Sequence, residues 1–231
     1  MSEPLKIVTT VALQAVIEKL KPAFTKATGL GIEMAFGPPS AAVELIRKGE
    51  AADIVVSTPD GIDALIQEGL VAGGSSRPVV RMQMGLAVGL NEAKPEIASA
   101  EQFKAALLGA KSIIHANPAT GSPSAEHFLK VVQQLGIADE VARKTTIRAG
   151  VVAHAVASDE CAMAVQQLAE LMLVDGVHVL GPFPHELQNY VPLSAAAHAQ
   201  SRAPQAAKVL IDLIAAPDTK SIIVEAGLLP A

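Results

Sequence analysis

Short apolar segments alternate with segments of helical spacing through the first 70 residues, and this alternation restricts the fold more than any other feature of the sequence. Glycines at positions 29, 49 and 69 follow the expected helices, where a left-handed residue commonly ends a helix. Such an alternation is typical of parallel strands joined by helical crossovers, so the sequence predicts an α/β protein. The expected strands begin at residues 5, 32 and 53, and the expected helices span residues 12–27, 40–48 and 62–67.

A long apolar run at residues 79–90 predicts that the chain passes from one lobe to another. The apolar run at residues 190–197 provides the return. Two lobes of about a hundred residues each fall within the usual size range of domains. We expect one lobe to comprise residues 1–82 and 192–231 and the other residues 83–191, with chain crossings near 80–88 and 188–195.

The composition excludes several classes of function. Hydrophobic residues make up 50% of the chain and charged residues 18%, which is typical of a packed globule rather than a disordered chain. Aromatic residues make up only 3%, which argues against recognition of sugars or bases by stacking. The net charge of −5, without a run of Lys or Arg, argues against nucleic acid as a partner.

Neither a metal nor a cofactor is expected. Cys161 is the single cysteine, which excludes an internal disulfide and a cysteine-based zinc site, and it is expected in the core. The six histidines show no spacing typical of metal ligands.

The first ten residues, MSEPLKIVTT, contain no apolar signal segment, and no apolar run approaches the ~20 residues of a membrane span. As written, the chain is expected to be cytoplasmic. If a signal segment has been removed, a periplasmic location is expected instead, and only then would an ABC permease be a partner. The sequence leaves the oligomeric state open.

Ligands of open α/β sheets bind beyond the carboxyl ends of the strands, so the loops there are the candidate binding segments. Thr9 and Thr10 end the first strand just before a helix, where hydroxyls and free N–H groups can receive a ligand oxygen. Ser40 is expected to cap the second helix and is a further candidate ligand. The alternative for all three is structural: strand propensity and helix capping.

The second lobe is expected to contribute an anion-binding helix start at Ser122, Pro123 and Ser124. Ser122 is expected at the N-cap and Pro123 at the first helical position, so that free N–H groups point at the ligand. The alternative is an ordinary capped surface helix.

Other candidate ligand-binding residues lie at later strand ends. Arg148 and Arg81 could pair with a carboxylate through a bidentate guanidinium, although each taken alone is more typical of a surface residue. Val152 belongs to the loop that follows Arg148. Gln166 and Gln167 follow a buried strand, and one of the two is expected to face the cleft and donate an amide N–H, with Gln166 as the candidate ligand residue.

Two histidines are candidates for moving protons. His127 lies about one turn into the helix that starts at Ser122, and His154 lies on a short helix after Gly150. Either could pair with a carboxylate or transfer a proton near neutral pH. The alternative is a surface or hydrogen-bonded histidine without a functional role.

Four segments resemble one protein family: KIVTTVALQAVIEKLKPAFTKATG, FGPPSAAVELIRKGEAADIVVST, NPATGSPSAEHFLKVVQQLGIAD and VEAGLLP. They are similar to the periplasmic molybdate-binding proteins of ABC importers, within the type II solute-binding superfamily. The resemblance covers nearly the whole chain. It implies a two-lobed type II periplasmic-binding-protein fold with a hinge of two crossing strands and a ligand cleft between the lobes.

The sequence departs from that family at the residues that hold the oxyanion. Two serine donors of the family correspond to Ala12 and Pro39 here, and its two tyrosines correspond to Gln166 and His127. The resemblance therefore implies the scaffold and not the molybdate ligand.

The segment GPFPHELQNYVPLSAAA is more similar to a branch of the superfamily that includes aconitate isomerase. We expect a domain that binds a small anion, a di- or tricarboxylate, in the cleft. The alternative is an isomerase of small carboxylates on the same scaffold, with His127 or His154 moving the proton. A component of oxyanion transport and a ligand-sensing domain are less favoured alternatives.

Overall fold

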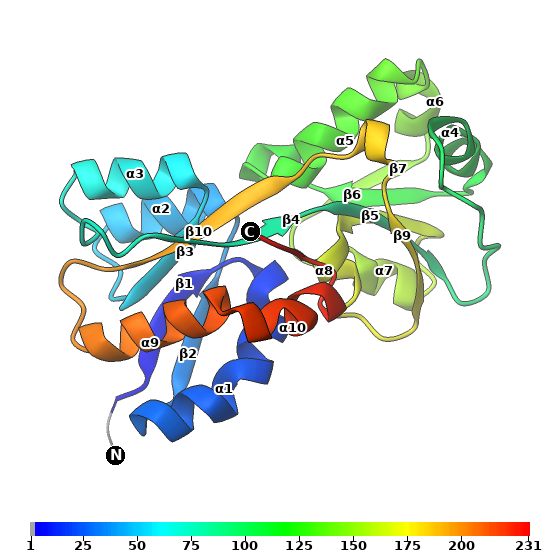
Figure 1. The fold of residues 1–231 in the computed structure, drawn as a ribbon. Helices are drawn as coiled ribbons and strands as arrows, with labels where there is room; N and C mark the ends of the chain where they lie inside the picture. The colour runs from blue at the N-terminus through cyan, green and yellow to red at the C-terminus, as the bar shows by residue number, and fades with distance from the viewer. Residues whose placement is uncertain (1–2) are drawn as a thin grey trace. The chain divides into compact units, whose positions relative to one another are not determined.

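The structure is a computed structural model, and it describes residues 3–231. Its described residues form two compact units (Figure 1). The first unit contains the described residues up to Arg81 together with Val191–Ala231, and the second contains Met82–Tyr190. Each unit has its own sheet, of six strands in the first and five in the second. The prediction of an α/β chain with two lobes is confirmed.

The first unit is built around three parallel strands. β1 pairs with β2 on one side and with β3 on the other, and both pairs are parallel, as the alternation of strands and helices predicts. β10 adds to β3 in the antiparallel direction, and the sheet order is β11-β4-β10-β3-β1-β2. The elements are β1 (Leu5–Thr9), η1 (Val11–Leu13), α1 (Gln14–Thr28), β2 (Ile32–Phe36), α2 (Pro39–Arg47), β3 (Ile54–Ser57), α3 (Pro59–Gln67), β4 (Arg77–Met82), β10 (Val191–Ala197), α9 (Pro204–Ala215), η4 (Pro217–Thr219), α10 (Lys220–Glu225) and β11 (Leu229–Pro230).

Helices cover both faces of this sheet. Val8, Val55 and Ala196, from three neighbouring strands, are buried with the apolar sides of α2 and α3. On the other face α1 and α9 lie side by side, with α9 against β10 (Figure 1). Because both faces are covered, the central strand β3 is buried along its whole length, as expected of a parallel sheet.

The start of α2 corrects one prediction from the sequence. Ser40 is not the N-cap; Pro38 holds that position in an extended conformation, and Pro39 is the first helical residue. Proline is favoured there because its missing N–H would have had no partner in the helix. Ser40 is therefore an exposed residue within the first turn.

The second unit contains a mixed sheet in the order β7-β6-β8-β5-β9. β6 is parallel to β7 and β8, and β5 is antiparallel to both β8 and β9. The elements are β5 (Met84–Gly89), α4 (Ala100–Gly109), β6 (Ile113–Ala116), η2 (Pro118–Thr120), α5 (Pro123–Gln134), α6 (Ala138–Ala142), β7 (Thr145–Arg148), α7 (Ala153–Ala157), β8 (Met163–Gln167), α8 (Leu168–Leu171), β9 (Val177–Pro182) and η3 (His185–Leu187).

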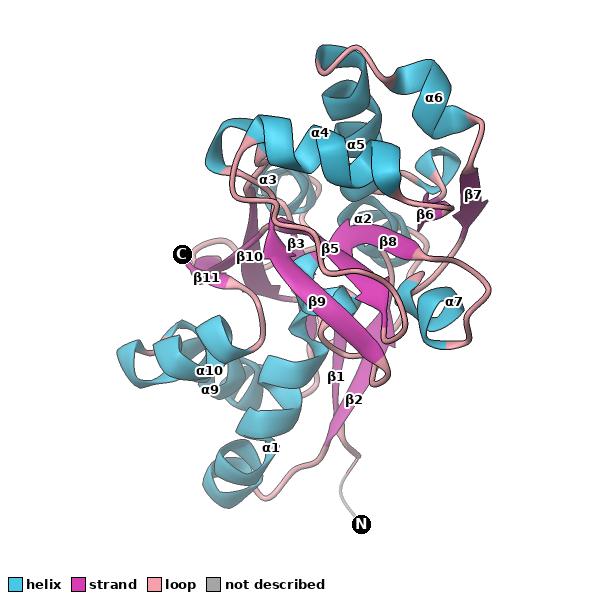
Figure 2. Cartoon of the chain, turned by 90° about the vertical axis from the view of Figure 1, so that its right-hand side faces the viewer, coloured by secondary structure: helices cyan, strands magenta, loops and turns pink. Residues whose placement is uncertain are grey.

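Side chains of the second sheet alternate between two cores. Val165 packs with Phe103 of α4 and Phe128 of α5, whereas the neighbouring Ala164 packs with the residues of α7 and α8. Figure 2 shows α4, α5 and α6 on one side of this sheet and α7 on the other. Cys161 is buried in the second of these cores, as predicted.

The long apolar run expected to cross between lobes forms two strands instead of one. β4 ends at Met82 in the first sheet and β5 begins at Met84 in the second, with Gln83 between them. The return leads from β9 to β10 through η3. At both places the chain passes from one sheet to the other. Within the described part of the chain, every helix is too short or too polar to traverse a lipid bilayer.

Candidate functional site

The first unit brings Thr9 and Thr10 to the carboxyl end of β1. Thr9 is fully buried, and its Oγ1 has no hydrogen-bond partner in the part of the chain that the structure describes. Thr10 is also buried, but its Oγ1 accepts from the N–H of Ala12 at 3.4 Å and caps η1, which leads directly into α1. The two adjacent hydroxyls therefore differ. The Thr10 hydroxyl accepts from a backbone N–H, whereas the Thr9 hydroxyl has no partner among the described residues.

Hydrogen bonds hold the neighbouring loop against this strand end. The Gly37 N–H donates to the Thr9 carbonyl at 3.0 Å, and the Ser57 hydroxyl donates to the Pro39 carbonyl at 2.8 Å. Ser57 ends the parallel strand β3 and is buried. The sequence analysis missed this serine, which could have been found by examining the last residue of each buried strand.

In the second unit, Ser122 and Ser124 come together at the start of α5. Ser122 is the N-cap and Pro123 the first helical residue, as predicted. The Ser122 side chain does not bond to the backbone N–H groups of the helix. Instead the two serine hydroxyls lie 2.9 Å apart, and Ser124 is buried. The first N–H groups of this twelve-residue helix therefore receive no side-chain cap from Ser122.

Gln166 holds the loop that contains Val152. Its Oε1 accepts from the Val152 N–H at 2.8 Å, and its Nε2 donates to the Gly150 carbonyl at 2.9 Å. Both predicted ligand residues are thus brought together, but they bind each other. This geometry makes Gln166 a residue that positions the loop, because both ends of its amide are engaged by protein.

The next residue, Gln167, has a buried polar atom without a partner among the described residues, as Thr9 does. Its side chain is buried at the end of β8, and its Oε1 has no hydrogen-bond partner within residues 3–231. Among the described residues, Thr9 Oγ1 and Gln167 Oε1 are the buried side-chain polar atoms left without a partner. A buried polar group without a partner costs about 1–3 kcal/mol, so each of these orphaned atoms points to a water or ligand that would complete it.

Glu170 is a titratable residue that the sequence analysis did not consider. It lies in α8, one turn beyond Gln166, and hydrogen-bonds to the Gln166 side chain. Desolvation by burial raises its pKa to about 7, and the bond from Gln166 lowers it only in part. A carboxyl group that titrates near neutral pH is a common feature of functional sites. The sequence signal that could have identified Glu170 is its position four residues after Gln166, near the end of β8.

The two arginines have protein partners. Arg148, at the end of β7, forms an ion pair with Glu160 at 2.6 Å, and this hydrogen bond holds the pKa of Glu160 below its usual range. Both side chains are about half exposed, so the pair contributes little to stability. Arg81 donates to the Pro230 carbonyl at 3.2 Å. Neither position by itself indicates a ligand contact.

The two candidate histidines and the buried His115 lie in three different environments. The Nε2 of His127 lies 2.7 Å from the Leu187 carbonyl, so the ring packs within its own unit. His154 is exposed on α7. His115, in β6, is buried with its Nδ1 2.7 Å from the Ala116 carbonyl, and burial lowers its pKa. Among the described residues, no group of three or more His, Cys, Asp or Glu side chains could hold a metal ion.

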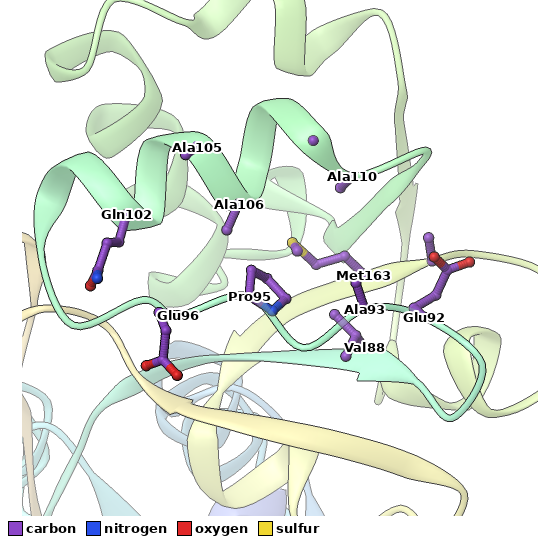
Figure 3. Close-up of a pocket in the computed structure, with 12 residues that line it drawn as sticks. Val88, Glu92, Ala93, Pro95, Glu96, Gln102, Ala105, Ala106, Ala110 and Met163 are labelled. Atoms are coloured by element: carbon purple, nitrogen blue, oxygen red, sulfur yellow. The ribbon is translucent and has the colours of Figure 1, made fainter.

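A separate hollow of about 410 Å³ lies in the second unit between α4 and the segment after β5 (Figure 3). Ala106 and Ala110 line it on the side of α4, and Pro95 and Met163 line it from the segment after β5 and from β8. Its lining residues include two glutamates and no lysine or arginine, which does not suit an anion. They are Val88, Glu92, Ala93, Pro95, Glu96, Gln102, Ala105, Ala106, Gly109, Ala110, Ala162 and Met163.

Comparison with known proteins adds a family and a fold. The sequence model of the family described as bacterial extracellular solute-binding protein matches residues 5–229. An aconitate isomerase from a Pseudomonas species is 28% identical over 233 residues, which cover 98% of this chain and 87% of that protein.

Two solved structures share the fold over nearly their whole length. The periplasmic molybdate-binding protein of Azotobacter vinelandii superposes with a TM-score of 0.78 at 19% identity, covering 98% of this chain and 99% of that one. PEB3, a Campylobacter jejuni protein solved with L-phospholactate bound, superposes with a TM-score of 0.71 at 13% identity, covering 98% and 100%. At these identities the likeness concerns the fold alone.

Proposed function

The chain belongs to the family of bacterial extracellular solute-binding proteins, and from this premise we propose that it binds a small organic anion carrying two or three carboxylates. The binding groups we propose are Thr9 and Thr10 in the first unit and Ser122, Ser124 and the start of α5 in the second. A solute-binding protein needs groups that replace the water around its ligand, and hydroxyls and free helix N–H groups can do this.

The observation that carries the proposal is the pair of orphaned buried atoms, Thr9 Oγ1 and Gln167 Oε1. Each lies at the carboxyl end of a strand that has parallel neighbours, which is where open α/β sheets bind ligands. The Thr9 hydroxyl can donate to an acceptor oxygen of a ligand, and the Gln167 Oε1 can accept from a ligand hydroxyl or protonated carboxyl. A hydroxycarboxylate such as citrate has this combination at neutral pH, whereas fully ionised aconitate and a bare tetrahedral oxyanion offer acceptors only.

An isomerase of small carboxylates is the second candidate function. It is favoured by the aconitate isomerase relative, which matches 98% of this chain. A proton shift needs a side chain that can take up and release a proton, and His127, His154 and Glu170 are the candidates in the second unit. The Nε2–H of His127 donates to the Leu187 carbonyl, so its Nδ1 would have to act.

Family membership also bears on location. Of the two alternatives that the sequence leaves open, a protein of an extracellular solute-binding family is more consistent with the periplasm than with the cytoplasm. In that setting an ABC permease would be the partner that receives the ligand. Detection of the native protein in a periplasmic extract would support this location, and its recovery with cytoplasmic markers would contradict it.

The proposed function is tested by measuring affinity with a panel of anions. Calorimetry would compare trans-aconitate, cis-aconitate and citrate with molybdate, tungstate and sulfate. We expect a tricarboxylate to bind more tightly than any inorganic oxyanion. Ser124→Ala should weaken binding about tenfold or more, since one hydrogen bond to a charged group is worth ~1.5–3 kcal/mol. Thr25→Val, which removes an exposed hydroxyl at the far end of α1, should leave the affinity unchanged.

Tight binding of an inorganic oxyanion without binding of any carboxylate would contradict the proposal. Turnover is followed separately by proton NMR of cis-aconitate in deuterated water. Formation of trans-aconitate with deuterium incorporation would establish the isomerase, and His127→Ala and Glu170→Gln would then show which group moves the proton. Binding without conversion would support the solute-binding function and contradict the isomerase.

A further inference from the structure

Glu170 has a structural connection to the candidate binding loop. Its carboxyl bonds to the Gln166 side chain, and the same side chain holds the Gly150 carbonyl and the Val152 N–H. One carboxyl group is therefore connected through a single side chain to the loop at residues 150–152.

The surroundings of Glu170 provide little that would compensate a negative charge. The strands of the second unit that pack most closely against α8 are β5, β8 and β9. β5 and β8 contain no titratable side chain, and β9 contains His178. Within α8 itself, Glu170 is the one titratable residue, and Asp175 beyond its end is exposed. An ionised Glu170 is therefore compensated mainly by the amide of Gln166.

We propose that Glu170 is a positioning residue that must be protonated for the anionic ligand to bind. The proposal rests on the proposed function, because it concerns the carboxylate that the chain is inferred to bind. A neutral Glu170 leaves the strand end without negative charge, and an ionised Glu170 repels the ligand. Ligand binding above neutral pH is then accompanied by uptake of one proton from solvent.

The proposal sets the direction and size of the pH dependence. If only the protonated form binds and the group titrates near pH 7, the apparent Kd should rise about 50-fold between pH 7 and pH 9. Over this interval the carboxylates of aconitate are already ionised, so the ligand contributes no change of its own. Glu170→Gln keeps the shape and the hydrogen-bonding capacity of the side chain but cannot ionise.

The experiment is calorimetric titration of trans-aconitate into the wild type, Glu170→Gln and Glu101→Gln at pH 7, 8 and 9. The wild type and Glu101→Gln, which lacks an exposed carboxyl of α4, should lose affinity with rising pH. Glu170→Gln should bind at pH 9 about as tightly as at pH 7. Repeating the wild-type titration at pH 8 in buffers of different ionisation enthalpy counts the protons taken up directly, and nearly one is expected. This count needs no variant to fold.

Binding of trans-aconitate that is independent of pH in the wild type, or that takes up no proton, would overturn the role of Glu170 and leave the carboxylate-binding function intact. A pH dependence that persists in Glu170→Gln would also overturn it. Absence of trans-aconitate and citrate binding at every pH, in the wild type and in Glu170→Gln, would instead overturn the proposed function and this inference together.

Discussion

At the scale of single residues, the partner of each polar atom decides its role more than its position in the sequence. Thr9 and Thr10 are adjacent, both are buried, and both lie at the end of the same strand. The Thr10 hydroxyl is used to cap η1, whereas the Thr9 hydroxyl has no partner among the described residues. The two threonines should therefore respond oppositely to the same substitution.

We expect Thr9→Val to raise the stability of the ligand-free protein and Thr10→Val to lower it. Valine keeps the shape of threonine, so the first change removes an unsatisfied buried hydroxyl, a gain of up to about 1–3 kcal/mol. The second removes a helix cap, a loss of about 1 kcal/mol. Urea unfolding of both variants measures the difference. Destabilisation by Thr9→Val as large as that by Thr10→Val would show that the Thr9 hydroxyl has a structural partner.

Asp53 has a buried carboxylate, and both of its oxygens accept hydrogen bonds. Its carboxylate accepts from the Lys6 N–H at 2.9 Å, the Ser201 hydroxyl at 2.7 Å and the Arg202 N–H at 3.1 Å. Burial acts to raise the pKa of Asp53, but these hydrogen bonds outweigh burial and hold the pKa below its usual range. The group therefore ties the start of β3 to β1 and to the segment before α9.

Asp53→Asn is expected to cost about 2 kcal/mol at pH 7, because charge-assisted hydrogen bonds are replaced by weaker ones. A lowered pKa in the folded state gives stability that is present above the unfolded pKa of about 3.9 and is lost as the pH falls through the folded pKa. The difference between wild type and variant should thus shrink below pH 4. Denaturant unfolding at pH 7 and pH 3 tests this, with the exposed Asp175→Asn as the control. An equal cost at both pH values would contradict the electrostatic explanation.

At the scale of elements, α8 is placed by a glycine in the strand beneath it. A Cβ at Gly85 would lie 2.7 Å from Leu168 Cδ1 and 3.0 Å from the Gly181 carbonyl oxygen. Gly85 also lies opposite Gln166 in the pairing of β5 with β8. The strand therefore allows the short helix that carries Glu170 to approach closely.

Gly85→Ala should displace α8 and lower the free energy of unfolding by about 1–3 kcal/mol, as overpacking of a close contact does. It should also weaken ligand binding, since Glu170 and Gln166 would move with the helix. Gly73→Ala is the matched control, because a Cβ there meets no described atom within 4 Å. Equal stability of the two variants in urea would show that the contact between β5 and α8 adjusts without cost.

At the scale of the whole molecule, the scaffold is shared with molybdate-binding proteins while the donors differ. The superposition on the Azotobacter vinelandii protein covers 98% of this chain. Ala12 and Pro39, which correspond by resemblance to the serine donors of that family, carry no hydroxyl. The shared fold thus leaves the choice of ligand to a few side chains.

Molybdate should bind at least a hundredfold more weakly than to a binding protein that has both serines. Each lost hydrogen bond to a charged group costs about 1.5–3 kcal/mol, and the two losses add. Calorimetry with molybdate at neutral pH measures this. A submicromolar Kd would mean that other groups replace the serines and that the correspondence of Ala12 and Pro39 to them is wrong.

The sequence by itself determined the α/β class, the two lobes and most of the elements. The strands that begin at residues 5 and 32 and the helices that end before Gly29, Gly49 and Gly69 lie where apolar periodicity and glycine place them, since these signals are local. β7 and α6 were missed because their few residues carry almost no periodic signal and β7 is largely exposed.

Only the tertiary structure decided which polar groups are free. The sequence offers Thr9 and Thr10, or Gln166 and Gln167, as equivalent neighbours, because hydrogen-bond partners such as the Val152 N–H come from elsewhere in the chain. In the same way, folding places Glu160 beside Arg148 and the Leu187 carbonyl beside His127. Burial in the folded chain raises the pKa of Glu170. Helix and strand propensity depends on residues that are close in the sequence. Desolvation and hydrogen-bond pairing depend on residues that become neighbours only when the chain folds.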